Sequence, residues 1–184
     1  MPKVDLSIYD NSDFHVGASR LKVICWFVVS ALLFRNPLLI SYGLKRKLLN
    51  LFGAKVGKGV VIKPGVKVKY PWLLEIGDYS WIGEDVWIDN LVPVSIGSHV
   101  CLSQGAMLLT GNHNYSKPTF DLMTGEITLE DGAWIGAKSV VCPGVYVETH
   151  AVLAVGSIAS GKLEAYQIYR GNPAEKVRER EIVG

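Results

Sequence analysis

The chain of 184 residues has an apolar content of 49% and a charged content of 20%, which fits one folded domain with appendages and excludes a disordered protein. The formal net charge of +2 conceals an asymmetry, because residues 1–70 carry +9 and residues 71–184 carry −7. The basic first part indicates a surface that meets phospholipids or phosphorylated substrates, although a solvated basic face would have the same composition. The three cysteines match no metal-binding spacing, so reduced thiols of a cytoplasmic protein are expected.

Residues 21–34 form the first apolar segment, and only Lys22 interrupts it. Its fourteen residues fall short of the roughly 20 that a helix needs to cross a bilayer, and no small-residue cleavage site of a signal peptide follows. A second apolar pattern covers residues 38–52. We therefore expect an N-terminal extension, residues 1–55, with helices that either rest on a membrane surface through residues 20–52 or pack on the rest of the protein or on another subunit.

A six-residue repeat occupies the middle of the chain, residues 56–160. Its aliphatic positions are Val56, Ile62, Val68, Ile76, Ile82, Ile88, Ile96, Leu102, Leu108, Leu129, Ile135, Val141, Val147 and Leu153. A strand residue advances about 3.3 Å, so six residues make one flat side and a corner, and three sides close a coil that pairs with its neighbours. A β-sandwich would instead show turn signals every 8–12 residues or so. The repeat predicts an all-β fold, a parallel β-helix of about five coils, followed by a C-terminal tail at residues 161–184.

Three insertions interrupt the repeat, and each follows the third side of a coil. They are therefore expected to stack at one corner of the triangle, where bulges and long loops often carry function. The first insertion contains Trp72 and the second begins at Asn90. The third is a loop over residues 110–126 with His113 and Tyr115. This edge is the candidate site.

Seven short motifs are specific enough to compare with known families. They are NPLL at 36–39, VIKPG at 61–65, YPW at 70–72, WIG at 81–83, TGNH at 110–113, PTFD at 118–121 and GNPA at 171–174. With them the chain resembles the hexapeptide-repeat acyltransferases, and among these the O-acetyltransferases of colanic-acid-type exopolysaccharide biosynthesis. The resemblance implies a left-handed coil, against the general right-handed rule. It also implies acetyl-CoA as donor, a sugar or lipid-linked saccharide as acceptor, a homotrimer, and a place in the cytoplasm or at the inner face of its membrane. No metal and no nucleic acid are expected.

The resemblance gives His113 the role of general base on the sugar hydroxyl that attacks the thioester. Histidine suits this step because its unperturbed pKa lies near 6.5, and such help contributes about 10²–10⁴-fold to the rate. Asn90 matches a residue that holds the acceptor, and Trp72 and Tyr115 are further candidate substrate contacts. Trp134 is expected to flank the acetyl group. The other expected donor contacts are Gly136, Ala137, Ser160, Lys176 and Arg178. In the trimer that the resemblance implies, His113 of one subunit works with Trp134 and the tail of its neighbour.

Three other functions are compatible with a β-helix, and the histidine positions argue against the first of them. A zinc carbonic anhydrase needs three protein ligands around the metal, but His99 and His150 lie two coils apart, roughly 9–10 Å, and cannot share one ion. A non-catalytic β-helix scaffold would tolerate His113→Ala. An acyltransferase that uses an amino-sugar amine or another small molecule as acceptor is compatible with every motif.

Overall fold

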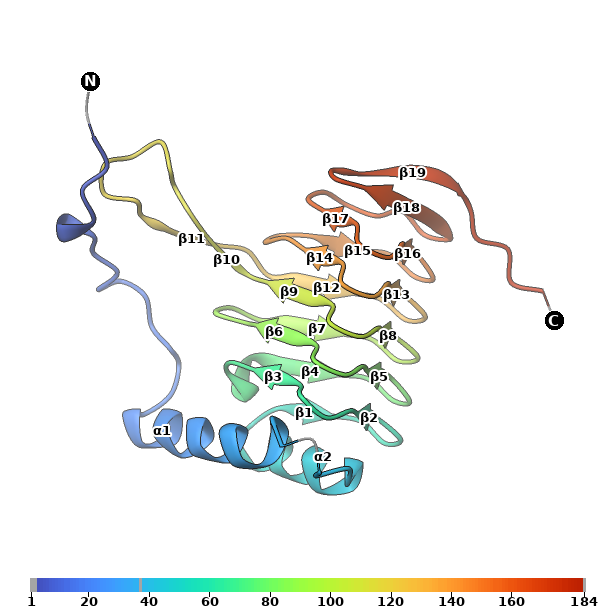
Figure 1. The fold of residues 1–184 in the computed structure, drawn as a ribbon, viewed down its shortest axis with the longest axis horizontal. Helices are drawn as coiled ribbons and strands as arrows, with labels where there is room; N and C mark the ends of the chain where they lie inside the picture. Colours follow the sequence, from blue (N-terminus) through green and yellow to red (C-terminus); the bar gives the residue numbers. More distant parts are fainter. Residues whose placement is uncertain (1–2, 37, 184) are drawn as a thin grey trace.

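The computed structural model describes residues 3–36 and 38–183, and shows a β-helix that stands on two helices (Figure 1). Pro37, in the second position of the NPLL motif, lies outside the described residues. After a short 3₁₀ turn, η1 (Leu6–Ile8), the chain forms α1 (Arg20–Val29), the π-helical turn η2 (Ser30–Phe34) and α2 (Tyr42–Leu51). The expected N-terminal helices are thus confirmed.

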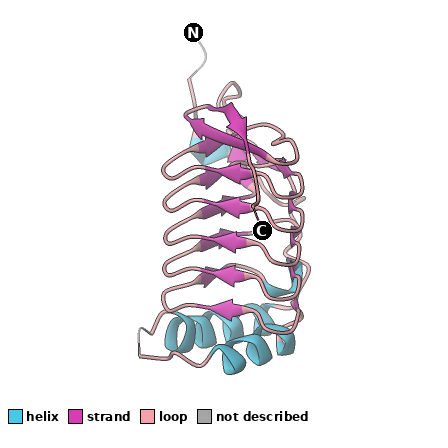
Figure 2. Cartoon of the chain, turned by 90° about the vertical axis from the view of Figure 1, so that its right-hand side faces the viewer, coloured by secondary structure: helices cyan, strands magenta, loops and turns pink. Residues whose placement is uncertain are grey.

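Both helices lie beneath the coils (Figure 2), and each begins at a serine N-cap. Ser19 accepts a hydrogen bond from the Lys22 amide and Ser41 from the Leu44 amide, as is typical of N-caps. Trp26 packs against Phe34 at 5.1 Å between ring centroids. Its indole Nε1 donates to the Val68 carbonyl at 2.9 Å, which ties α1 to the first coil.

Three parallel sheets form the sides of the prism, named faces A, B and C. Face A contains β1 (Lys55–Val56), β4 (Leu74–Ile76), β7 (Val94–Ile96), β12 (Ile127–Leu129) and β15 (Tyr146–Val147). Face B contains β2 (Val61–Ile62), β5 (Trp81–Ile82), β8 (Cys101–Leu102), β13 (Trp134–Ile135), β16 (Val152–Leu153) and β18 (Gln167–Gly171). Face C contains β3 (Lys67–Val68), β6 (Trp87–Asp89), β9 (Met107–Leu109), β14 (Val140–Val141) and β17 (Ile158–Ala159).

The predicted aliphatic positions stack in register inside the prism. On face B, Ile62 pairs with Ile82, Ile82 with Leu102, Leu102 with Ile135, and Ile135 with Leu153. Each is at most 1% exposed. Burying such a side chain contributes about 1.5–3 kcal/mol, so this internal column is the main source of stability that the repeat encodes.

The described residues build five complete coils and part of a sixth. The sixth arises because the expected tail is not a simple tail: β18 continues face B, and β19 (Ala174–Glu179) folds back antiparallel on it. The coil length drops from 18 residues, between Ile135 and Leu153, to 16 residues, between Leu153 and Tyr169. Counting in sixes therefore loses the register after residue 160.

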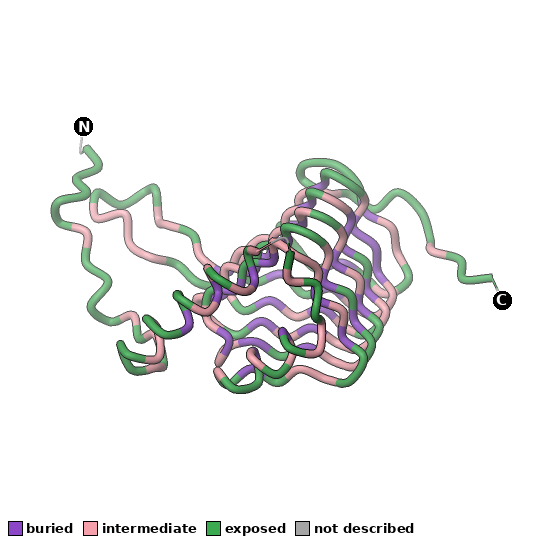
Figure 3. Tube along the Cα trace, turned by 60° about the horizontal axis from the view of Figure 1, so that its bottom comes forward, coloured by how far each residue is buried: buried purple, intermediate pink, exposed green. Residues whose placement is uncertain are grey.

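All three insertions lie at the corner between faces C and A, as the repeat predicts. The first forms a 3₁₀ turn, η3 (Pro71–Leu73), and the second covers residues 90–93. The third extends away from the body as an antiparallel hairpin of β10 (Gly111–His113) and β11 (Leu122–Thr124). Figure 3 shows this hairpin and the N-terminal segment projecting together from one edge, with few buried positions.

Candidate active site

Thr110 fixes the base of the hairpin to the coils. Its hydroxyl donates to the Asp89 carbonyl at 2.9 Å and accepts from the Leu91 amide at 2.8 Å. Its own carbonyl accepts from the Gly125 amide at 2.9 Å. The hairpin is therefore anchored where it leaves the third coil and where it enters the fourth, which gives His113, three residues after Thr110, a defined position.

The His113 ring is held by its neighbour across the hairpin. Nδ1 lies 2.9 Å from the Phe120 carbonyl, and a carbonyl can only accept, so Nδ1 carries the proton. The ring also stacks on Phe120, with 4.5 Å between centroids and 9° between planes. In the neutral imidazole this leaves the lone pair on Nε2, the atom that a general base uses.

Asp121 is not the group that orients this histidine. Its carboxylate accepts a 2.8 Å hydrogen bond from Lys117, and this bond is the main reason that the pKa of Asp121 is lowered. The Phe120 carbonyl takes the place that a carboxylate holds in other histidine bases.

The N-terminal strap, residues 3–19, supplies a site residue that sequence reasoning missed. Tyr9 meets the His113 ring edge-on, with 5.8 Å between centroids and 64° between planes. The Asp5 amide donates to the Pro118 carbonyl at 3.0 Å, so the strap lies beside the hairpin (Figure 1). No motif marks Tyr9, because its contact joins segments more than a hundred residues apart.

Trp72 and Tyr115, the two predicted aromatic contacts, occupy different surroundings. Trp72 is half-buried, stacks on Tyr70 at 5.1 Å, and its Nε1 donates to the Val16 carbonyl at 2.7 Å. It therefore holds the lower end of the strap. Tyr115 is 79% exposed on the hairpin, open to a ligand or to another subunit.

Asn90 is fully buried at the corner, at 0% exposure. Its Oδ1 accepts from the Tyr70 amide at 3.0 Å and its Nδ2 donates to the Tyr70 carbonyl at 2.7 Å. The side chain joins two coils with both ends of its amide. In this structure no Asn90 atom is exposed for the expected contact with an acceptor.

The candidate donor residues lie on the side of the prism opposite His113. Trp134 is 45% exposed on face B, and its Nε1 donates to the Ser103 hydroxyl at 2.9 Å. Gly136 follows it in a tight turn, where a Cβ would come within 2.6 Å of the Val155 amide nitrogen. Ala137 is half-buried in the same turn. One chain alone does not bring these residues to His113.

The C-terminal candidates lie at the top of the prism. Ser160 is exposed just after β17, and Lys176 and Arg178 are exposed on β19. Lys176 pairs with Glu164 at 3.1 Å, so a phosphate there would compete with a carboxylate. Within residues 3–36 and 38–183, no group of three metal-ligating side chains converges. No helix in the described part of the chain has the length and apolarity that crossing a membrane requires.

Comparison with known proteins agrees with this architecture. No family model matches the chain. It is 38% identical over 176 residues to the putative colanic acid biosynthesis acetyltransferase of Escherichia coli K12, covering 96% of this chain and 97% of that protein. It is 25% identical to the galactoside O-acetyltransferase of the same organism, over 73% of this chain and 68% of that protein.

A solved hexapeptide-repeat-containing acetyltransferase from Vibrio cholerae superposes with a TM-score of 0.80, at 19% identity, over 90% of this chain and 96% of that one. Identity that low shows the shared fold, whereas the relative at 38% identity, matched over almost its whole length, shows the family. The chain therefore belongs to the family of the colanic acid biosynthesis acetyltransferase, among the hexapeptide-repeat acetyltransferases with a left-handed β-helix.

Proposed function

We propose that this acetyltransferase moves an acetyl group from acetyl-CoA to a sugar hydroxyl during exopolysaccharide biosynthesis, with His113 as the general base. The observation that carries the proposal is the bond between His113 Nδ1 and the Phe120 carbonyl, which leaves Nε2 free to take a proton. Supporting it, one relative is named for colanic acid biosynthesis, another for galactoside O-acetylation, and the Vibrio cholerae protein has been solved with acetyl-CoA.

The chemistry follows from this tautomer. Nε2 takes the hydroxyl proton while the oxygen attacks the thioester carbonyl carbon, and the resulting tetrahedral intermediate breaks its C–S bond. The imidazolium then returns the proton to the departing thiolate of CoA. While His113 is cationic, its Nδ1–H still donates to the Phe120 carbonyl, a charge-assisted bond that is stronger than the neutral one.

The assembly that we propose is a homotrimer, and the outward side chains of the three faces support it. Face A is polar, with Lys55, Glu75, Ser95, Thr128 and Tyr146 outward. Face B carries Trp81 and Trp134 on its outer side. Face C carries Trp87 and Met107. Packing face B of one subunit against the part of face C above Trp87 on the next would bury Trp134 and Met107 and leave Trp87 exposed. It would also bring His113 of one chain to the Trp134 and Gly136 side of its neighbour. Ser160, Lys176 and Arg178 would then meet the CoA arm and phosphates.

The catalytic proposal is tested by His113→Ala in an assay of acetyl-CoA-dependent thiol release with a saccharide acceptor. We expect kcat to fall about 10²–10⁴-fold because the general base is lost. His99→Asn is the matched control, because His99 stacks on Tyr79 in a distant turn. A near-normal kcat for His113→Ala would refute the assignment, and an N-acetylated product in mass spectrometry would refute sugar O-acetylation.

We also propose that residues 20–52 rest on an anionic membrane surface. Leu21, Ile24, Phe27 and Leu32 are each at least 60% exposed, and the nearby Arg20 and Lys47 are exposed cations, the combination expected of an interfacial helix. Flotation with anionic liposomes should recover the wild-type protein and lose the Leu21→Ser/Ile24→Ser/Leu32→Ser variant. Equal flotation of both proteins would contradict the proposal.

A further inference from the structure

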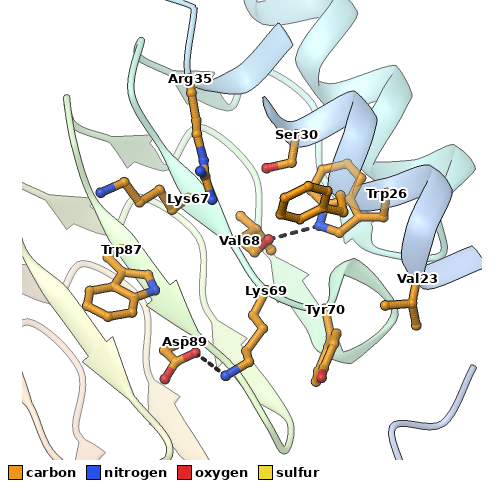
Figure 4. Close-up of a pocket in the computed structure, with 11 residues that line it drawn as sticks. Val23, Trp26, Ser30, Arg35, Lys67, Val68, Lys69, Tyr70, Trp87 and Asp89 are labelled. Atoms are coloured by element: carbon orange, nitrogen blue, oxygen red, sulfur yellow. Dashed lines mark hydrogen bonds and ion pairs between the residues drawn. The ribbon is translucent and has the colours of Figure 1, made fainter. Parts of the chain in front are cut away.

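A cavity of about 450 Å³ lies between the N-terminal helices and face C, on the two lowest coils. Figure 4 shows its wall: Val23, Trp26 and Ser30 on the helical side, and Lys67, Val68, Lys69, Tyr70, Trp87 and Asp89 on the β-helix side. His113 and the candidate donor residues take no part in it. The cavity is therefore separate from the proposed catalytic site.

The π-helical turn η2 shapes this cavity. The Arg35 amide donates to the Ser30 carbonyl five residues earlier, at 3.2 Å, the bond that defines a π turn, and such turns are frequent at functional sites. In an α-helix, residues five apart point about 140° away from each other. The wider turn places Arg35 on the same wall as Ser30, and Figure 4 shows its guanidinium extending between Lys67 and Trp26.

The cavity carries an excess of positive charge. Its charged side chains are Arg35, Lys67, Lys69 and Asp89. Lys69 is neutralised by Asp89 at 2.9 Å. Within the described part of the chain, Arg35 and Lys67 form no ion pair. A planar guanidinium beside an ammonium is a combination suited to phosphate oxygens.

Aromatic side chains line the same cavity. The Trp26 ring faces the cavity, while its N–H is already bonded to the Val68 carbonyl. Trp87 is 39% exposed, with the Lys67 ammonium 6.0 Å from its ring centroid. Phe27 also lines the cavity, and at 64% exposure it belongs to the exposed apolar side chains of α1. These rings can bind an apolar or planar group attached to the anion.

We propose that this cavity binds an organic phosphate. Its phosphate or pyrophosphate group would contact Arg35 and Lys67, and its apolar or planar portion would lie against Trp87 and Phe27. A lipid headgroup and a soluble nucleotide share this chemistry. The site is independent of acetyl transfer, because neither the base nor the donor residues line the cavity.

Isothermal titration calorimetry of the full chain tests the proposal, with CoA present at saturation to occupy the donor site. The probes are dodecyl phosphate for the lipid source and UDP for the nucleotide source. We expect at least one to bind, and Arg35→Gln/Lys67→Gln to weaken it about tenfold or more. The probe that binds more tightly identifies the source.

The matched control is Lys47→Gln/Lys58→Gln, which removes two exposed cations outside the cavity. An equal loss of affinity in both double variants, or no binding of either probe to wild type, would overturn the proposal. Lys67→Glu is a second variant that is expected to fold normally, because Lys67 is exposed at the outer surface. It should abolish binding while the circular dichroism spectrum stays that of wild type.

Discussion

Two aromatic residues define the surroundings of the proposed base. Phe120 presents both its carbonyl and its ring to His113, and it does so from a left-handed backbone conformation with φ of 51°. Tyr9 closes another side of the imidazole from the N-terminal strap. The proposed base is thus contacted by two segments that are far apart in the chain, and we expect the strap to form a wall of the proposed acceptor site.

We predict that Tyr9→Ala raises the KM for the saccharide acceptor about 2–10-fold, because an aromatic pair is worth about 0.5–1.5 kcal/mol. The KM for acetyl-CoA should stay unchanged, because Tyr9 is not among the proposed donor contacts. Tyr9→Phe keeps the ring and serves as the control. Steady-state kinetics with each substrate varied will show the split, and an equal rise in both KM values would contradict the placement of Tyr9.

At the scale of the element, α2 closes the lower end of the β-helix. The Lys45 ammonium is fully buried and donates to the Ile62 and Lys63 carbonyls at 3.3 and 3.0 Å. The Arg46 guanidinium donates to the Val60 carbonyl at 2.8 Å. The first coil has no coil below it, so these carbonyls would lack hydrogen-bond donors. Lys45 and Arg46 supply the donors and thereby cover an open sheet edge.

Lys45→Met should lower the free energy of unfolding by about 1–3 kcal/mol, because it leaves buried carbonyls unpaired. Burial lowers the pKa of Lys45 in the folded protein below its ordinary value of 10.5. At pH values between the folded-state pKa and 10.5, the unfolded chain therefore binds more protons than the folded one. Wild-type stability therefore gains from this group as pH rises through that window. Urea unfolding of wild type and Lys45→Met should be measured at neutral and alkaline pH. The difference in the free energy of unfolding between the two proteins should be larger at alkaline pH. A difference that shrinks would contradict this account.

The corner between faces C and A is a second structural element that can be tested. Asn90→Ala leaves the Tyr70 amide and carbonyl without partners, so we expect a loss of about 1–3 kcal/mol in the free energy of unfolding. Its KM for the acceptor should stay near that of wild type. The opposite pattern, a raised KM with unchanged urea unfolding, would support the acceptor-binding role that the family resemblance implies for Asn90.

At the scale of the whole molecule, the prism separates His113 from the candidate donor residues. A site shared between subunits predicts that two inactive variants complement each other. His113→Ala lacks the base, and Ala137→Trp blocks the pantetheine arm, so each alone should be inactive. Random mixed assembly by co-expression should restore about a quarter of the sites. Activity that stays at the level of the single variants would show that each chain carries a complete site.

The repeat, the buried columns and the corner of the insertions could be predicted because each depends on residues close in sequence. Every coil repeats one pattern, and the aliphatic residues from Val56 to Leu153 need only point inward to stack. The hexapeptide count failed after residue 160 for a physical reason: the last coil is two residues shorter. The motif TGNH marked His113, but nothing in it indicated Phe120 as the partner that sets its tautomer.

The sequence by itself determined the β-helix, its core and the edge that carries His113, because a period of six residues translates directly into sides, corners and layers. Only the tertiary structure decided which side chains meet at that edge. Tyr9 reaches His113, Lys45 caps the first coil, and Arg35 enters a cavity on face C through contacts between segments far apart in the chain. Such contacts depend on how the N-terminal segment folds back along the coils, and this path lies outside the periodic pattern.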